Sequence, residues 1–144
     1  MKTLPAPLRL IAILGLALVL GGCASYQVRV EGGKSLAGMQ RFFVVTNLND
    51  NHALDRRIVE AIKAHGFEAE SGPLTLMPDN AQLIVSYQDR WSWDFGDHLV
   101  LLSLTVRDPN RNEMVATVSY NASIPEREPV STLVTRLVDR LFAK

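Results

Sequence analysis

The sequence has 144 residues, a length typical of one domain and too short for two ordinary domains. It carries 15 basic and 15 acidic side chains, and without residues 1–22, which hold Lys2 and Arg9, 13 basic remain against 15 acidic. A nucleic-acid-binding protein needs clustered Lys and Arg to neutralise phosphates, and no such cluster follows residue 22. Nucleic acid is therefore not an expected partner.

The N-terminal segment has the pattern of an export signal. A charged start with Lys2 and Arg9 precedes an uncharged apolar run over residues 10–20. A helix needs about 20 residues at a rise of about 1.5 Å each to span the hydrocarbon of a bilayer, so this run is too short. We expect residues 1–22 to be a signal that is removed, rather than a permanent membrane helix.

The run ends in Leu20-Gly21-Gly22-Cys23, which resembles the lipobox of bacterial lipoproteins. In that family the cysteine thiol receives diacylglycerol, a peptidase that recognises the three preceding residues cuts before the cysteine, and the new amine is acylated. The resemblance implies lipid attachment at Cys23. The alternative is an ordinary secretory signal followed by a free or buried cysteine, but Cys23 has no partner for a disulfide within the chain.

The resemblance also implies a location. Each buried methylene adds about 0.8 kcal/mol, so two or three acyl chains, palmitate among them, would hold the protein permanently to a membrane. Ala24, rather than Asp, follows the cysteine, which in the resembling family marks export to the outer membrane. We expect a periplasm-facing domain anchored to the outer membrane, with the inner membrane as the less favoured alternative. The diacylglycerol and N-acyl chain are covalent, and no other cofactor is expected.

The first half of the mature chain alternates loops with three short elements. Residues 23–40 are interpreted as a lipidated N-terminus and tether, or a short edge strand at 26–30, and residues 41–46 as a buried strand. A helix is predicted over 52–65, with Asn51 as its cap and Gly66 just past its end. A short alternating stretch follows at 67–70.

The second half predicts a three-stranded antiparallel meander and a helix. Apolar residues alternate over 83–95, 100–106 and 114–120, with turns between the strands. A helix is predicted with Pro129 in its first turn, because an apolar stripe of helical period runs from Val130 to Leu141. The predicted fold is α+β: a two-layer sandwich in which a mainly antiparallel sheet of four to six strands carries two helices on one face, forming a single domain over 41–144.

A second, broader resemblance covers residues 42–142. The segments 54–62, Gly66-Phe67 and 81–87 look like a family of small uncharacterised bacterial envelope lipoproteins, whose members often carry Asp where this chain has Gln82. The resemblance implies an α+β fold and a lipoprotein facing the periplasm. It brings no catalytic residues.

The sequence contains no recognised catalytic or metal-binding motif. No pair among His52, His65 and His98 has zinc-ligand spacing, there is no second cysteine, and no phosphate-binding loop or nucleophile turn occurs. We expect hydrogen-bonded or solvated histidines, no metal and no enzyme. A hydrolase with a dispersed site remains the alternative.

Three aromatic residues at alternate positions, Trp91, Trp93 and Phe95, form the candidate partner or ligand surface. They are either core residues at a hairpin, or, if the strand outruns the helices, an exposed platform for a partner, a lipid or a glycan. The favoured function is a structural or accessory interaction module that docks on an envelope protein complex. The alternative is a lipoprotein that binds a lipid or small hydrophobic ligand with the Trp91/Trp93 hairpin.

Overall fold

The computed structural model describes residues 24–31, 34–93, 96–123 and 127–143. The predicted signal peptide, with Leu20, Gly21 and Gly22, lies outside the described residues, as do Cys23 and Phe95.

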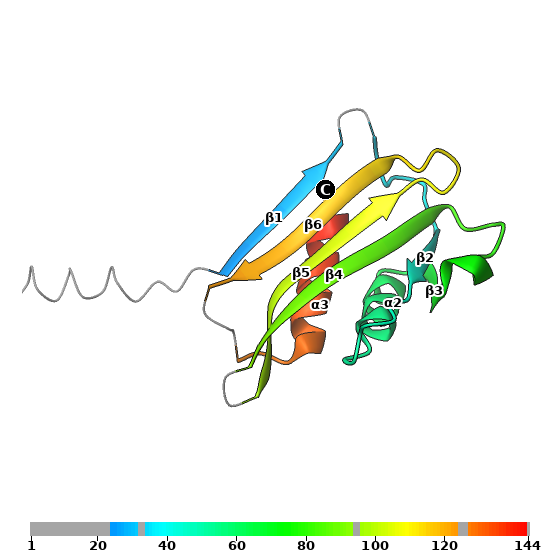
Figure 1. Ribbon diagram of the computed structural model, residues 1–144. Helices are drawn as coiled ribbons and strands as arrows, with labels where there is room; N and C mark the ends of the chain where they lie inside the picture. The colour runs from blue at the N-terminus through cyan, green and yellow to red at the C-terminus, as the bar shows by residue number, and fades with distance from the viewer. Residues whose placement is uncertain (1–23, 32–33, 94–95, 124–126, 144) are drawn as a thin grey trace, which may run out of the picture.

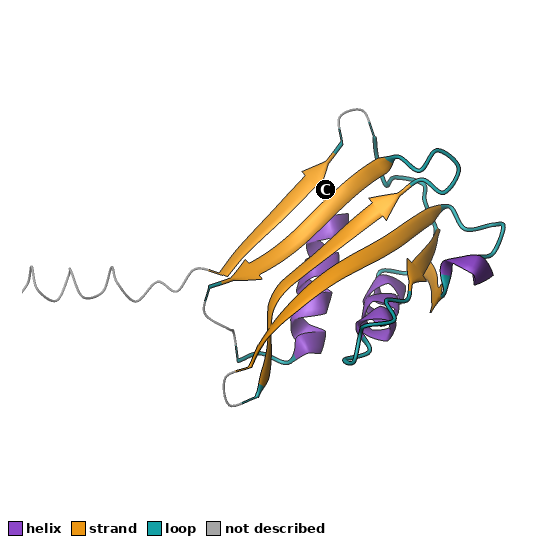
Figure 2. Ribbon diagram, viewed as in Figure 1, coloured by secondary structure: helices purple, strands orange, loops and turns teal. Residues whose placement is uncertain are grey.

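The described chain forms a two-layer α+β sandwich, as predicted. Its elements are β1 (Ala24–Val30), β2 (Arg41–Val45), α2 (Leu54–Ala64), β3 (Glu68–Gly72), the short 3₁₀ helix η1 (Leu74–Leu76), β4 (Leu83–Trp93), β5 (Asp97–Arg107), β6 (Met114–Ala122) and α3 (Val130–Phe142). The strands form one six-stranded sheet in the order β1-β6-β5-β4-β2-β3. Both helices pack against the same face of this sheet (Figures 1 and 2).

Strands β4, β5 and β6 form the predicted antiparallel meander. Their alternation places one set of side chains in the core beneath the helices, including Leu102, Leu104 and Val118, all fully buried. The opposite face carries polar residues such as Thr105 and Ser119. One covered face and one wet face are what alternating sequences of this kind produce.

Strand β2 adds a parallel part to the sheet, because it pairs in parallel with both β3 and β4. Parallel neighbours need a crossover, and α2 supplies it between β2 and β3. Phe42, Phe43 and Val44 are consecutive and all buried. Burial on both faces explains why this strand has a continuous apolar run rather than an alternating one.

Gln82 ties the start of β2 to the start of β4. Its side-chain oxygen Oε1 accepts hydrogen bonds from the backbone N–H groups of Gln40, at 2.7 Å, and Arg41, at 3.1 Å. The position requires an acceptor, and a carboxylate oxygen supplies one equally well.

The helix ends differ in part from the prediction. Gly66 takes a φ of 83° just past α2, as predicted, and its N–H donates to the carbonyl of Lys63. Asn51 is not the cap: the helix begins after Ala53, whose φ is 52°, and the backbone N–H of Leu54 donates to the carboxylate of Asp50 instead. Pro129 directly precedes α3 rather than lying in its first turn.

The segment interpreted as a tether, or as a short edge strand at 26–30, contains an edge strand that begins two residues earlier, at Ala24. β1 pairs with β6 along its whole length, starting with Ala24 opposite Ala122. Its second half is incompletely covered by α3, so that Val28 is 45% and Val30 48% exposed. Within the described residues, no helix combines the length and the apolar character needed to cross a membrane.

Candidate functional site

The candidate surface lies at one end of the sheet, called here the hairpin end. It is defined by Ala24 at the start of β1, Ala122 at the end of β6, and the pair of Trp93 and Asp97 where β4 passes to β5. At this end β4 and β5 run past β6 and past the beginning of α3 (Figure 1). The sheet therefore outruns its helical cover here.

Trp91 and Trp93 share the helix-side face of β4 with Leu83, Val85 and Tyr87, because they occupy alternate positions. The register with β5 shifts between Arg90 and Trp91, so that Trp91 pairs with Leu99. This bulge keeps the apolar Leu99 of β5 beside Trp91, whereas Trp93 pairs with Asp97. Burial nonetheless falls along β4: Tyr87 is buried, Trp91 is half-buried and Trp93 is 81% exposed.

Trp91 is covered by the loop between β2 and α2. The imidazole of His52 stacks on its indole, with ring centroids 3.6 Å apart and planes inclined by 15°. The indole Nε1–H donates to Asp89 Oδ2 at 2.6 Å, and His52 Nε2 lies 3.2 Å from Asp97 Oδ2. The face of the Trp91 ring is thus covered by His52 and its N–H is bonded to Asp89, so Trp91 is packed against the domain.

Asp50 fixes the loop that carries His52. Its carboxylate accepts hydrogen bonds from the backbone N–H groups of His52 and Leu54, at 2.7 and 2.6 Å, and from the hydroxyl of Tyr87 at 2.8 Å. Burial acts to raise the pKa of Asp50, but these hydrogen bonds outweigh it and lower that pKa below its usual value of 3.8. Burial, together with the neighbouring Asp50 carboxylate, raises the pKa of Tyr87.

Of the two interpretations of the aromatic segment, core packing applies to Trp91 and the exposed platform applies to Trp93. Trp91 packs against the domain, whereas Trp93 projects beyond it. Sequence reasoning missed the contribution of His52 and Asp50, because nothing in their spacing links them to a strand about forty residues later.

The polar side chains of the described residues do not assemble into a metal centre: no group of three or more His, Cys, Asp or Glu side chains is close enough to hold an ion. His65 Nε2 lies 2.7 Å from Asp139 Oδ1, which joins the end of α2 to α3. His52 and His65 thus each pair with a carboxylate, in line with the expected hydrogen-bonded histidines.

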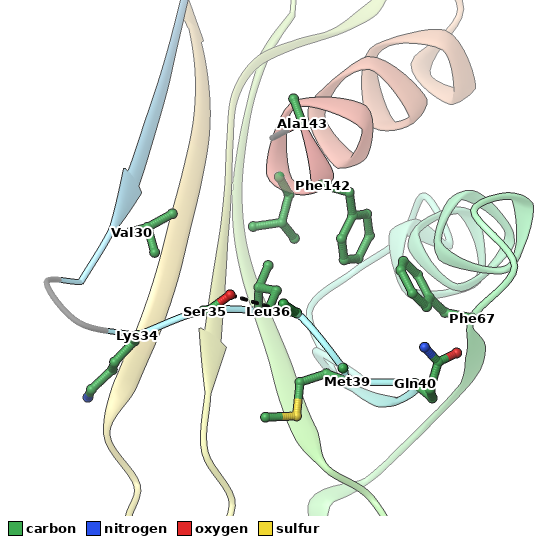
Figure 3. Close-up of a pocket in the computed structure, with 12 residues that line it drawn as sticks. Val30, Lys34, Ser35, Leu36, Met39, Gln40, Phe67, Phe142 and Ala143 are labelled. Carbon is green, nitrogen blue, oxygen red and sulfur yellow. Dashed lines mark hydrogen bonds between the residues drawn. The ribbon is translucent and has the colours of Figure 1, made fainter.

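An apolar pocket of about 420 Å³ lies at the opposite end of the sheet. It opens between the segment after β1, the residue Phe67 that follows α2, and the end of α3 (Figure 3). Its apolar lining includes Leu36, Met39, Phe67 and Phe142. The rings of Phe67 and Phe142 are 4.7 Å apart and also contact Phe42, which is buried.

Comparison with solved structures shows which known proteins share the fold of this chain. No protein-family model matches the chain, and no curated protein sequence matches it. A variant of the PelC dodecamer from Paraburkholderia phytofirmans is similar, with a TM-score of 0.60 and 17% identity over 83% of this chain and 95% of that chain. A second structure of the PelC dodecamer gives 0.57 and 18%, covering 81% and 94%. A PDZ domain protein from Parabacteroides distasonis gives 0.54 and 6%, over 84% of this chain and 36% of that one. The chain has a PelC-like fold.

Proposed function

We propose that the protein is a lipid-anchored structural module of the cell envelope, held to the outer membrane through Cys23 and facing the periplasm, where it assembles with further copies of itself. The lipobox-like Leu20-Gly21-Gly22-Cys23 supplies the anchor. The observation that carries the proposal is the position of β1, since Ala24, the residue after Cys23, is already paired in the sheet. An anchor at Cys23 therefore fixes the domain directly at the membrane.

Self-assembly is supported by the edge strand. Among the strands that the structure describes, β1 has no neighbour on its outer side, and Val28 and Val30 expose apolar surface beside it. With the hairpin end at the membrane, the two sheet edges point sideways, so that neighbouring copies would meet edge to edge. PelC, whose fold this chain has, forms a dodecamer in its solved structures. In the accessory form of this proposal, the protein docks on a larger envelope complex that contains other proteins.

The experiment is made on protein purified from bacterial membranes in mild detergent. We expect the mass of the intact mature protein to correspond to a chain that starts at Cys23 and carries diacylglycerol and an acyl chain. We also expect light scattering to give a particle of several copies. A Cys23→Ala variant should lose both the lipid and the membrane association, because the thiol is the attachment point.

Two results would contradict the proposal separately. An unmodified chain, or one that retains residues 1–22, would overturn the anchor. A lipidated protein that remains monomeric at all concentrations, and that is recovered from membranes without a stable partner, would overturn the structural role.

A second candidate function is favoured by the pocket at the opposite end of the sheet. A lipoprotein that binds a small hydrophobic ligand needs an apolar concavity, and pockets for such ligands begin at about 300 Å³. The pocket of about 420 Å³ lined by Leu36, Met39, Phe67 and Phe142 meets this requirement. This candidate places the ligand away from Trp91 and Trp93, the residues that the sequence suggested for it.

This second candidate predicts that an apolar fluorescent probe such as N-phenyl-1-naphthylamine binds the purified domain. Leu36→Lys puts a charge into the pocket lining and should weaken probe binding about tenfold or more, because an ammonium is poorly tolerated in an apolar site. Leu74→Lys, an exposed leucine outside the pocket lining, is the matched control. Equal probe binding by both variants would exclude the pocket as the ligand site.

A further inference from the structure

Trp93 and Ala24, the residue that follows Cys23, lie at the same end of the sheet, and the strand register gives the relative heights of these two residues. Ser25 pairs with Asn121, Asn121 with Leu101, and Leu101 with Arg90, so these four residues form one row across four strands. Ala24 is one residue beyond this row and Trp93 is three. At about 3.3 Å per residue, Trp93 projects roughly 7 Å farther along the strands than Ala24.

Cys23 directly precedes Ala24 in the chain, and Ala24 is already paired with Ala122 in the sheet. Its lipid chains would therefore enter the bilayer close to the height of the hairpin end. Three strand spacings separate β1 from β4, a lateral distance of about 14 Å. A membrane that receives the acyl chains thus extends beneath β4 as well.

The exposed side chain of Trp93 suits such a surface. Trp93 is 81% exposed, although a tryptophan carries one of the largest apolar surfaces of any side chain. An indole combines an apolar ring with one N–H donor, which is why tryptophan collects where lipid headgroups meet the acyl chains.

We propose that Trp93 inserts into the headgroup region of the membrane that holds Cys23, so that the domain is attached at two points and stands with its strands pointing away from the bilayer. The inference rests on the lipid anchor of the proposed function. A single anchor leaves a domain free to tilt about its attachment. A second contact about 14 Å away on the sheet removes one direction of that motion.

The two tryptophans make the experiment internally controlled, because the chain has only two. Lipidated protein is reconstituted into vesicles of phosphatidylethanolamine and phosphatidylglycerol, with or without lipids brominated just below the headgroup. Trp91→Phe leaves Trp93 as the only fluorescent indole, and Trp93→Phe leaves Trp91. We expect bromine to quench Trp93 at least about twofold more than Trp91, whose ring is covered by His52.

Several results would overturn the proposal. If Trp93 is quenched no more than Trp91 in protein that carries its lipid, Trp93 does not enter the membrane although the anchor stands. If its emission shifts to the blue on reconstitution without bromine quenching, Trp93 is covered by protein, either a second copy or a partner. If the protein carries no lipid, the anchor and the membrane contact fail together.

A second measurement guards against misfolding of Trp91→Phe, which removes the ring that stacks on His52. The exposed Trp93→Phe and Trp93→Ser variants leave that stack unchanged. Both should keep the circular dichroism and thermal stability of the wild type. Only Trp93→Ser should lose the membrane contact, which is measured as increased access of a water-soluble quencher to a fluorophore attached at the hairpin end.

Discussion

The carboxylate of Asp50 organises the loop that covers Trp91. It accepts three hydrogen bonds at 2.6–2.8 Å, two from the backbone on the approach to α2 and one from Tyr87 on β4. The residue therefore joins the beginning of a helix to the middle of the sheet. His52 is positioned over Trp91 as a consequence, because its own N–H is one of the three donors.

We predict that Asp50→Asn destabilises the domain by about 1–2 kcal/mol at neutral pH, the usual cost of losing a charged acceptor at a helix start. Because the folded state lowers the pKa of Asp50, the carboxylate stabilises the fold fully above its unfolded pKa near 4, and the stabilisation disappears as the pH falls through the lower folded pKa. Urea unfolding of the wild type and the variant at several pH values measures this difference.

The control for charge alone is Asp79→Asn, at an exposed turn before β4. It should change the free energy of unfolding by less than about 0.5 kcal/mol, as most surface substitutions do. A difference between wild type and Asp50→Asn that stays constant from neutral to strongly acidic pH would contradict the assigned role of the carboxylate.

At the scale of elements, β1 is a strand with two different faces. Tyr26 packs against Tyr120 beneath the helical layer, and Arg136 donates to the hydroxyl of Tyr26 at 2.9 Å. Farther along, Val28 and Val30 leave that cover. The first half of the strand therefore belongs to the core, and the second half is available to another molecule.

We predict that Val28→Lys combined with Val30→Lys breaks the proposed assembly without unfolding the subunit. An ammonium buried without a partner costs several kcal/mol, and about 1.4 kcal/mol already weakens association tenfold. Light scattering of the lipidated protein measures the size. Gln27→Lys, on the opposite face of β1, is the matched control and should leave the assembly intact; equal sizes for all three proteins would contradict this use of the edge.

Elements whose pattern is local were predictable from the sequence. The alternation in β4, β5 and β6 and the stripe from Val130 to Leu141 depend on neighbouring residues alone, and both are confirmed. The cap of α2 was not, because Asn51 and Asp50 are both good acceptors and the choice depends on contact with Tyr87. The parallel pairing of β2 also escaped prediction, since it joins segments about forty residues apart.

At the scale of the whole molecule, the candidate surface exists because β4 and β5 are longer than the layer that covers them. β4 and β5 are 11 residues each, whereas β6 is 9, and the pairing of β6 with β5 extends toward the hairpin only as far as Leu101. The helices and the loop at His52 cover the sheet only as far as Trp91. No local pattern in the sequence indicates where the helical layer ends relative to the sheet. The burial of Trp91 and Trp93 could therefore not be predicted from the sequence.

The pairing of Ala24 with Ala122 sets an order of events during maturation. A membrane peptidase and acyltransferases need an accessible, unpaired backbone around Cys23, and a strand that is already hydrogen-bonded to β6 from Ala24 onward restricts that access. Because β1 is at the edge, the other five strands can pair before it docks. If Cys23 is acylated, we expect cleavage and acylation to come first and closure of the last strand to follow, so that processing in the membrane decides when folding is complete.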